Sequence, residues 1–313
     1  MPDAKPEQRY PEDKWDSRAE YMAGLRILLH NDDYLEFLVT RVWKLDRPCR
    51  VVDFGCGAGR SGLMLMPLLP KGSTYTGIDK SAALLTEARR VFAGSPYEAE
   101  FFEGDVHEVP FGDDSFDLAF SQVVLMHIAD PMGAIQEMIR VTRHGGMVIT
   151  CDANRNAANA LIHIDELDQQ DTVPLDMIQT INREIKRQTG VDHNIGIKTP
   201  VLMHKAGLKN VGARVSDCVR LVLPPIQSDF DEAVFRAMCD DGLGPARLSD
   251  DERAKLKAFH VKYGISEEAA EKEIDREQSQ DFRANGRDYH TAYTSLLSFS
   301  FGTVDKAGDT SEK

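Results

Sequence analysis

Short apolar runs alternate with longer segments of mixed polarity through the first half of the chain. Five runs are apolar enough to predict buried strands, and they lie at 51–52, 73–78, 99–103, 118–120 and 146–150. Between the last two runs, apolar residues recur at the three- and four-residue spacing of a helix, namely Ala134, Ile135, Met138 and Ile139. Strands that alternate with helices predict an α/β fold with a largely parallel sheet.

The first predicted strand leads into a glycine-rich turn. Asp53 follows the strand, and Gly55, Gly57 and Gly59 come next at alternate positions before a segment with helical character. Strand, glycine turn and helix make up the first βα turn of a nucleotide-binding unit, where the backbone must come close to a ligand. The dinucleotide fingerprint G-x-G-x-x-G would place its third glycine where this chain has Arg60.

An acidic residue follows the second predicted strand. Asp79 and Lys80 come directly after 73–78, and Asp79 lies 20 residues beyond Gly59. An acid at this place can accept hydrogen bonds from both ribose hydroxyls of a bound nucleoside. The position supports an adenosine ligand, but NAD enzymes share it, so it does not choose between cofactors.

The pattern Asp-x-Gly-x-Gly-x-Gly at 53–59 resembles motif I of the class I S-adenosylmethionine-dependent methyltransferases, of the type that acts on small molecules. The rest of the family's motif set follows in order over about residues 47–153, as Asp79, Gly104-Asp105, Phe116-Asp117 and Gly145-Gly146. The resemblance implies that S-adenosylmethionine is the cofactor. It also implies an α/β fold with a Rossmann-like, seven-stranded mixed sheet, an antiparallel last strand, helices on both faces and helical lid insertions.

The same resemblance implies the cofactor-binding residues. In the family, the glycine loop packs against the methionyl and ribose parts of the cofactor. An acid in the place of Asp105 accepts a hydrogen bond from the exocyclic amine of adenine, and the backbone N–H of the next residue, Val106, meets the ring nitrogen. The residues expected to bind the cofactor are Tyr21, Asp53, Gly55, Gly57, Asp79, Lys80, Asp105, Val106 and Gln122.

Beyond residue 153 the core is expected to alternate with insertions. The segment 291–301 alternates Leu297, Phe299 and Phe301 with serine, which is the period of a strand and fits the antiparallel seventh strand of the methyltransferases. A sixth strand is predicted over 210–223. The expected organisation begins with an N-terminal arm and helical lid over 1–45, with one helix at about 15–30 and a second from the break at 30–33 to about Lys44. A cofactor-binding core over 46–153 is followed by an insertion over 154–190 and further core over 191–223. A helical insertion over 224–287, the last core strand over 288–306 and a tail over 307–313 complete it.

Candidate catalytic residues follow from the chemistry of methyl transfer. The sulfonium of the cofactor makes its methyl group electrophilic, so the protein acts mainly by positioning the two reactants and excluding water. A hydroxyl or ammonium acceptor also needs a base, and the candidate histidines are His127, His163, His193 and His290. His127 is the predicted catalytic residue because it lies past the carboxyl end of the fourth strand, where ligands of open α/β sheets bind. A structural role for His127 is the alternative.

Two further polar candidates lie beyond the fifth strand. Asn154 is the predicted contact to the acceptor, with capping of the following helix as the alternative. His163 and Asp165 could suggest metal ligands, but no third partner accompanies them, so no metal is expected.

The composition excludes several classes of function. The formal net charge of −14 argues against a nucleic-acid partner, because neutralising phosphates needs clustered lysine and arginine. The five cysteines contain no Cys-x-x-Cys pair, so neither a zinc site nor a disulfide framework is expected. The polar N-terminus and the apolar run 61–70, which Pro67 interrupts, predict neither a signal peptide nor a membrane span, so a cytoplasmic location is expected.

Together these patterns favour a methyltransferase that acts on a small-molecule acceptor, with a homodimer as a candidate assembly. An NAD(P)-dependent oxidoreductase is the alternative enzyme, opposed by Arg60 and by the pattern of the terminal strand. A cofactor-binding partner subunit without transfer activity is the non-enzymatic alternative. The identity of the acceptor atom does not follow from the sequence.

Overall fold

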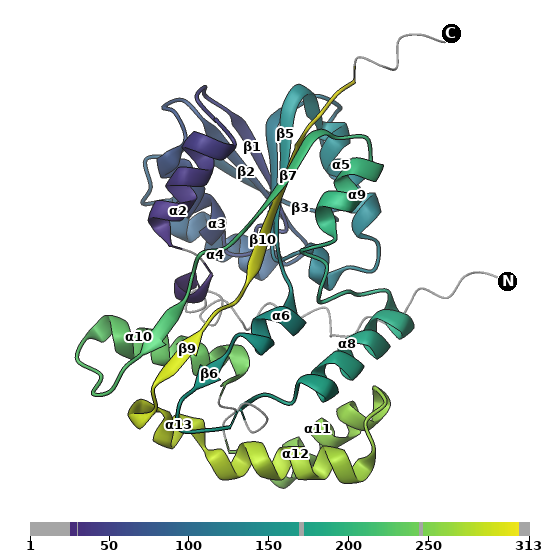
Figure 1. Ribbon diagram of the computed structural model, residues 1–313. Coiled ribbons are helices and arrows are strands. Elements are labelled where there is room, and N and C mark those ends of the chain that lie inside the picture. The colour runs from purple at the N-terminus through teal and green to yellow at the C-terminus, as the bar shows by residue number, and fades with distance from the viewer. Residues whose placement is uncertain (1–25, 30, 169–171, 244–246, 307–313) are drawn as a thin grey trace, which may run out of the picture.

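Seven strands form the larger of two sheets (Figure 1). The computed structural model describes residues 26–29, 31–168, 172–243 and 247–306, and in it the larger sheet has the order β3-β2-β1-β4-β5-β10-β7. The strands are β1 (Arg50–Phe54), β2 (Thr74–Asp79), β3 (Ala99–Glu103), β4 (Phe116–Gln122), β5 (Thr142–Ala153), β7 (Lys209–Val215) and β10 (Leu297–Thr303). β10 pairs antiparallel with β5 and β7, and the other neighbours are parallel. This confirms the Rossmann-like mixed sheet expected from the sequence.

Helices cover both faces of this sheet, which explains why its central strands are apolar on both sides. Val51 and Leu118 have no exposed surface. The helices are α2 (Asp32–Phe37), the π-helix η3 (Leu38–Val42), α3 (Arg60–Leu65), the 3₁₀ turn η4 (Met66–Leu68), α4 (Ala82–Phe92), the 3₁₀ turn η5 (Leu125–His127), α5 (Pro131–Val141) and α9 (Thr199–Lys205). The side chains of Ser81 and Asp130 cap α4 and α5, because each accepts a hydrogen bond from the backbone N–H three residues further on.

A second sheet has three strands in the order β6-β9-β8, with β6 at His163–Ile164, β8 at Arg220–Val222 and β9 at Thr291–Tyr293. The single strand predicted over 291–301 is therefore wrong, because β9 and β10 belong to different sheets. Leu296 separates them, and its φ of 41° is incompatible with an extended strand.

The strand predicted over 210–223 is also two strands, β7 and β8, in different sheets. Between them, the Ser216 hydroxyl accepts a hydrogen bond from the Cys218 backbone N–H at 3.3 Å. A local side-chain bond of this kind gives the backbone an alternative to the strand ladder. The chain therefore leaves the larger sheet after β7 and enters the smaller sheet at β8.

The described residues of 155–191 and 216–296 form a region, here called the cap, beyond the carboxyl ends of the parallel strands (Figure 1). Its helices are α6 (Arg155–Ala160), α8 (Leu175–Thr189), α10 (Asp229–Met238), the π-helical turn η6 (Cys239–Leu243), α11 (Asp250–Lys262), α12 (Glu267–Gln280), α13 (Phe282–Asn285) and the 3₁₀ turn η7 (Gly286–Asp288). A separate hydrophobic cluster, which includes Val222, Phe235 and Tyr293, holds the cap together. The segments expected as insertions thus contain helices, while their status as insertions and their role as a lid stay predictions.

Most of the helix expected at about 15–30 lies outside the described residues. The structure describes residues 26–29 of it and places a 3₁₀ turn, η2, at Arg26–Leu28. Tyr21, a predicted cofactor contact, lies outside the described residues and stays a prediction.

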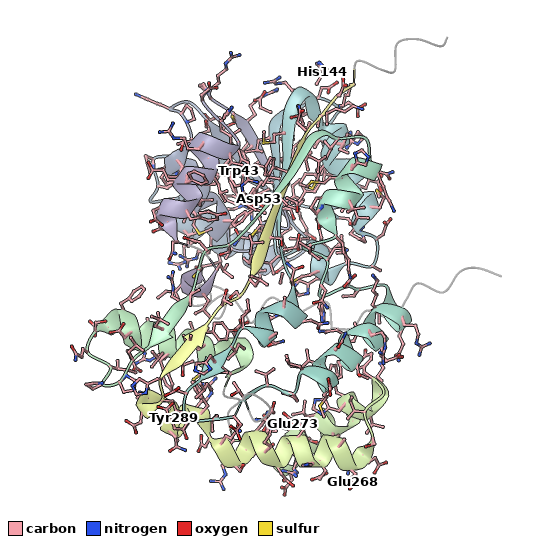
Figure 2. All side chains as sticks on the ribbon, viewed as in Figure 1. Trp43, Asp53, His144, Glu268, Glu273 and Tyr289 are labelled. Atoms are coloured by element: carbon pink, nitrogen blue, oxygen red, sulfur yellow. The ribbon has the colours of Figure 1, made fainter. Side chains whose placement is uncertain are left out.

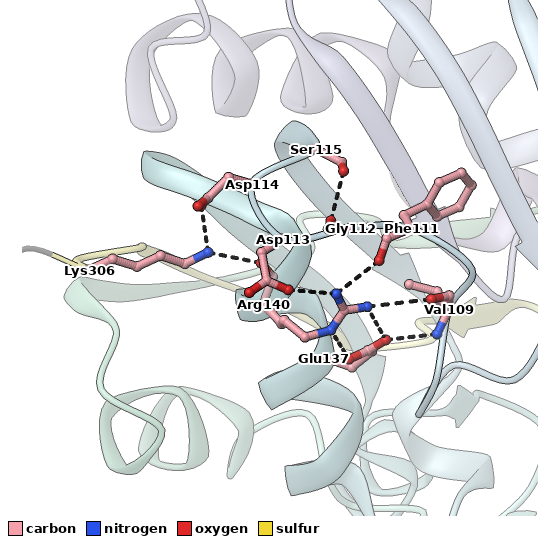
Figure 3. A network of polar contacts seen from close by, with 9 residues as sticks. All are labelled: Val109, Phe111, Gly112, Asp113, Asp114, Ser115, Glu137, Arg140 and Lys306. Carbon is pink, nitrogen blue, oxygen red and sulfur yellow. Dashed lines mark hydrogen bonds and ion pairs between the residues drawn. The ribbon is translucent and has the colours of Figure 1, made fainter. Parts of the chain in front are cut away.

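A polar network fastens the loop before β4 to α5 (Figure 3). Arg140 donates to the Glu137 carboxylate through Nε and Nη2, both at 2.7 Å, and to the Phe111 carbonyl through Nη1 at 2.9 Å. Glu137 in turn accepts from the Val109 backbone N–H at 2.7 Å. Lys306, just beyond β10, donates to the Arg140 carbonyl at 2.9 Å. The network fixes how the chain enters β4, whose opposite end carries residues of the candidate site.

No helix within the described ranges is both long enough and apolar enough to cross a membrane. The five cysteines are buried thiols, and none is in a disulfide.

Candidate active site

The glycine loop between β1 and α3 has a backbone conformation that glycine adopts without strain. Gly55, Gly57 and Gly59 have φ values of 71°, 52° and 73°. A Cβ atom on Gly55 would lie 2.5 Å from Cγ2 of Val124, so the chain beyond β4 lies directly against the loop. The loop therefore presents bare backbone at the carboxyl end of β1, where a ligand can approach closely.

Asp79, the last residue of β2, is tied to this loop. Its Oδ2 accepts a hydrogen bond from the Gly57 backbone N–H at 2.8 Å, and its Oδ1 accepts from the Ser81 backbone N–H at 2.9 Å. A carboxylate accepts about four hydrogen bonds, so these two are compatible with ribose hydroxyls as further donors. The same side chain thus orients the loop and stands where the sequence predicts ribose recognition.

Asp105, which follows β3, is held by Lys80 and His107. Its Oδ2 pairs with Lys80 Nζ at 2.9 Å, while its Oδ1 accepts from the His107 backbone N–H at 2.9 Å and lies 2.8 Å from His107 Nδ1. Burial raises the pKa of Asp105, but the hydrogen bonds from His107 and Lys80 outweigh it and bring the pKa to about 2. Asp105 is therefore ionised at neutral pH, and the next residue, Val106, is buried in the main hydrophobic core.

Asp53, near the end of β1, lies in the interior of the part of the molecule that holds the larger sheet (Figure 2). Its side chain has no exposed surface, and its Oδ2 accepts from the Tyr75 hydroxyl at 2.6 Å and from the Ser61 hydroxyl at 2.9 Å. Burial raises the pKa of Asp53 to about 7, and the two hydroxyls work against that rise. These contacts give Asp53 a role in holding the turn, and its predicted contact with the cofactor stays a prediction.

The chain makes a strained turn as it leaves β4. Gln122, a predicted cofactor contact, is half-buried, and Val123 has a φ of 58°. A β-branched residue rarely adopts this left-handed conformation, and such strain is found mainly at functional sites. The Val123 backbone N–H is anchored on the Cys151 carbonyl of β5 at 2.7 Å. The turn directs the following residues, including His127, across the carboxyl ends of β4 and β5.

Asp152 of β5 supports the turn that carries His127. The carboxylate is fully buried, and Oδ1 accepts from the Met126 backbone N–H at 3.2 Å. Burial raises the pKa of Asp152 to about 7, while hydrogen bonds from the backbone of 124–126 oppose the rise. A buried acid on β5 thus sets the position of a histidine that follows β4.

The structure brings together two of the four candidate histidines. The rings of His127 and His193 lie edge to face, with centroids 6.3 Å apart and an interplanar angle of 67°. His163 is in β6 of the smaller sheet, and His290 directly precedes β9 of the same sheet. His290 pairs there with Glu166 at 2.7 Å.

Asn154 is buried at the junction of β5, β10 and the segment that carries His193. Its Nδ2 donates to the Ser298 hydroxyl at 2.7 Å, and its Oδ1 accepts from the Ile197 backbone N–H at 2.7 Å. The side chain does not cap α6. Its predicted contact with the acceptor stays a prediction, which these two bonds do not favour. Within the described residues, no group of three histidine, cysteine or acidic side chains is arranged to hold a metal ion.

Comparison with known proteins shows which family most of the larger sheet belongs to. Residues 52–150 match the methyltransferase domain family, and a demethylmenaquinone methyltransferase of Desulfitobacterium hafniense is 38% identical over 104 residues. Residues 52–150 form a class I S-adenosylmethionine-dependent methyltransferase domain. A ubiquinone biosynthesis O-methyltransferase of Alkalilimnicola ehrlichii is 33% identical over 116 residues. The two matches take in 33% and 37% of this chain, and they span less than half of those relatives, at 41% and 46% of their lengths.

A solved structure shares the arrangement of the methyltransferase domain. Phosphoethanolamine N-methyltransferase 2 of Haemonchus contortus, in complex with S-adenosyl-L-methionine, has a TM-score of 0.50 at 16% identity. The likeness covers 95% of this chain and 60% of that one. At this identity it concerns the fold alone.

Several contacts at the carboxyl ends of the parallel strands could not be predicted from the sequence. Two contacts were not expected, although both acids lie at or after the ends of predicted strands. His107 donates a hydrogen bond to Asp105, and Asp152 accepts one from the Met126 backbone N–H. His193 also contacts Asn182, whose Oδ1 lies 3.1 Å from His193 Nδ1. Asn182 lies on α8, outside every motif, so nothing in its local sequence indicated this contact.

Proposed function

We propose that this chain transfers the methyl group of S-adenosylmethionine to a small-molecule acceptor. The observation that carries the proposal is the placement of three features at neighbouring strand ends: the glycine loop after β1, Asp79 on β2 and the ionised Asp105 after β3. Relatives named for demethylmenaquinone and for ubiquinone biosynthesis support a small-molecule acceptor.

The residues at this edge fit the cofactor. The methionyl and ribose parts lie along the backbone of the glycine loop, which carries no side chain at Gly55 and Gly57, and the Asp79 carboxylate accepts hydrogen bonds from the ribose hydroxyls. Asp105 accepts from the adenine amine, and the Val106 backbone N–H donates to the ring. When bound, the cofactor supplies an electrophilic methyl group on its sulfonium.

The other predicted cofactor residues have less direct roles in this proposal. Lys80 acts by holding Asp105, and Asp53 acts by holding the glycine loop from below. Gln122 and Tyr21 stay predicted contacts, the first at the carboxyl end of β4 and the second outside the described residues.

The acceptor is proposed to bind between the carboxyl ends of β4 and β5 and the cap. Two bases, His127 and His193, stand at that edge, and ligands of open α/β sheets bind outside the carboxyl ends of the strands. The cap is proposed to set specificity for the acceptor, because segments added to a rigid sheet can vary in sequence without disturbing it.

Two measurements test the proposal. Isothermal titration calorimetry is expected to show binding of S-adenosylmethionine and S-adenosylhomocysteine and no binding of NAD. Incubation with methyl-labelled S-adenosylmethionine and a metabolite extract is expected to label a small molecule and so identify the acceptor. Binding of NAD without a response to either sulfur nucleoside would contradict the proposal, and cofactor binding without any labelled product would favour the non-catalytic partner subunit.

A further inference from the structure

Asn182 and Asn156 hold His193 in a chain of side-chain hydrogen bonds. Asn182 Nδ2 donates to Asn156 Oδ1 at 2.7 Å, which leaves Asn182 Oδ1 facing His193 Nδ1 at 3.1 Å. An amide oxygen only accepts hydrogen bonds, so with Asn182 in this orientation His193 Nδ1 is the donor and carries the proton. In the neutral ring, the lone pair is then on Nε2.

The backbone around His193 is fixed to the end of β5. The His193 carbonyl accepts from the Arg155 backbone N–H at 3.2 Å, and the Gly196 N–H donates to the Ala153 carbonyl at 3.2 Å. A Cβ on Gly196 would lie 2.3 Å from the Asp152 carbonyl oxygen, so the two segments are in close contact. His193 is therefore placed at the carboxyl end of β5 by the backbone, and its ring is oriented by α6 and α8.

We propose that His193 is the general base of the methyl transfer and that Asn182 is the residue that positions it. This inference rests on the proposed function. Nε2 of His193 takes the proton from the acceptor's nucleophilic O–H or N–H group as that atom bonds to the methyl carbon. The bond between methyl carbon and sulfur breaks at the same time, its electron pair stays on sulfur, and His193 becomes an imidazolium that returns its proton to water.

The arrangement matches what a base needs. A histidine is neutral and basic near neutral pH, and which nitrogen accepts the proton is set by the hydrogen bond on the other nitrogen. General-base catalysis by a positioned side chain contributes roughly 10²- to 10⁴-fold to a rate. His127, whose ring lies edge to face with that of His193, gives a second variant for comparison.

The first test needs no acceptor. Two-bond proton–nitrogen NMR spectra of the full chain, saturated with S-adenosylhomocysteine, are expected to show His193 with a protonated Nδ1 and an unprotonated Nε2. The resonances are assigned by their loss in His193→Gln. Asn182→Asp keeps an acceptor oxygen and is expected to keep this tautomer, whereas Asn182→Ala is expected to shift it toward protonated Nε2. A wild-type His193 that carries its proton on Nε2 overturns the proposal.

The second test uses the acceptor found with the metabolite extract. His193→Gln is expected to lower turnover roughly 10²- to 10⁴-fold and leave the affinity for S-adenosylhomocysteine unchanged. His144→Gln, near the amino end of β5 and so at the opposite edge of the sheet, is the matched control and is expected to keep wild-type turnover. If His193→Gln turns over within about tenfold of wild type, or if His127→Gln alone loses turnover, His193 is not the base and the proposed function still stands. A wild-type chain that binds no sulfur nucleoside overturns both.

Discussion

Asp79→Ala is expected to weaken the binding of S-adenosylhomocysteine. The substitution removes the charged acceptor of two ribose hydroxyls, and hydrogen bonds to charged groups contribute about 1.5–3 kcal/mol each. Because the freed hydroxyls can turn to water at this open edge, the expected net loss is about 1–3 kcal/mol. That corresponds to roughly a 5- to 160-fold rise in Kd, which calorimetry measures directly.

The same substitution is also expected to destabilise the fold. It leaves the backbone N–H groups of Gly57 and Ser81 without the acceptors that lie 2.8 and 2.9 Å from them. Losing such bonds costs about 1–3 kcal/mol in the free energy of unfolding. Asp79→Asn keeps one carbonyl oxygen, so it is expected to lose less cofactor affinity and less stability than Asp79→Ala.

Asp117→Ala is the matched control for Asp79→Ala. Asp117 lies near the amino end of β4, at the opposite edge of the sheet, where it accepts from the Arg50 backbone N–H at 2.8 Å and from the side chain of Arg143. Its loss is expected to lower the free energy of unfolding without changing Kd. If Asp79→Ala is folded and binds S-adenosylhomocysteine as tightly as wild type, Asp79 does not recognise the ribose and the reasoning fails.

Four further changes have expected outcomes. Gly55→Ala should lower the free energy of unfolding, measured by urea denaturation, by about 2–4 kcal/mol. The φ of 71° at this position is strained for alanine, and the added methyl group would meet Val124. Unchanged stability would contradict this. Glu137→Ala should lower the free energy of unfolding by about 2–4 kcal/mol, because it leaves a buried backbone N–H and part of Arg140 unpaired. Asp113→Ala, at the exposed rim of that network, should lower it by under about 1 kcal/mol. The pKa of Asp53 is raised to about 7, so its contribution to stability is present below about pH 4 and is lost as pH rises toward 7; Asp53→Asn should flatten that part of a pH series of unfolding curves. Addition of S-adenosylhomocysteine should protect 154–190 and 226–287 from hydrogen exchange, and protection confined to the glycine loop and the strand ends would contradict the role of these segments as a lid.

Much of the core could be predicted from the sequence because its signals are local. The glycine loop, Asp79 and Asp105 each come at or just after the end of a predicted strand. Parallel strands bring their carboxyl ends to one edge, so three motifs far apart in the chain meet without any further information. The spacing of the glycines then favoured a methyltransferase over a dinucleotide enzyme, and the family comparison confirmed this for residues 52–150.

The strand pairing in the cap and the contacts of His193 could not be predicted from the sequence, because they depend on tertiary structure. The period of two in 291–301 indicated extended backbone, but it could not show that Leu296 would divide the strand between two sheets, since alternation does not specify the partner strand. His193 and Asn182 meet only because α8 packs beside α6 and the chain then returns to the end of β5. Side-chain partners of this kind depend on the packing of whole elements, which no spacing along the chain records.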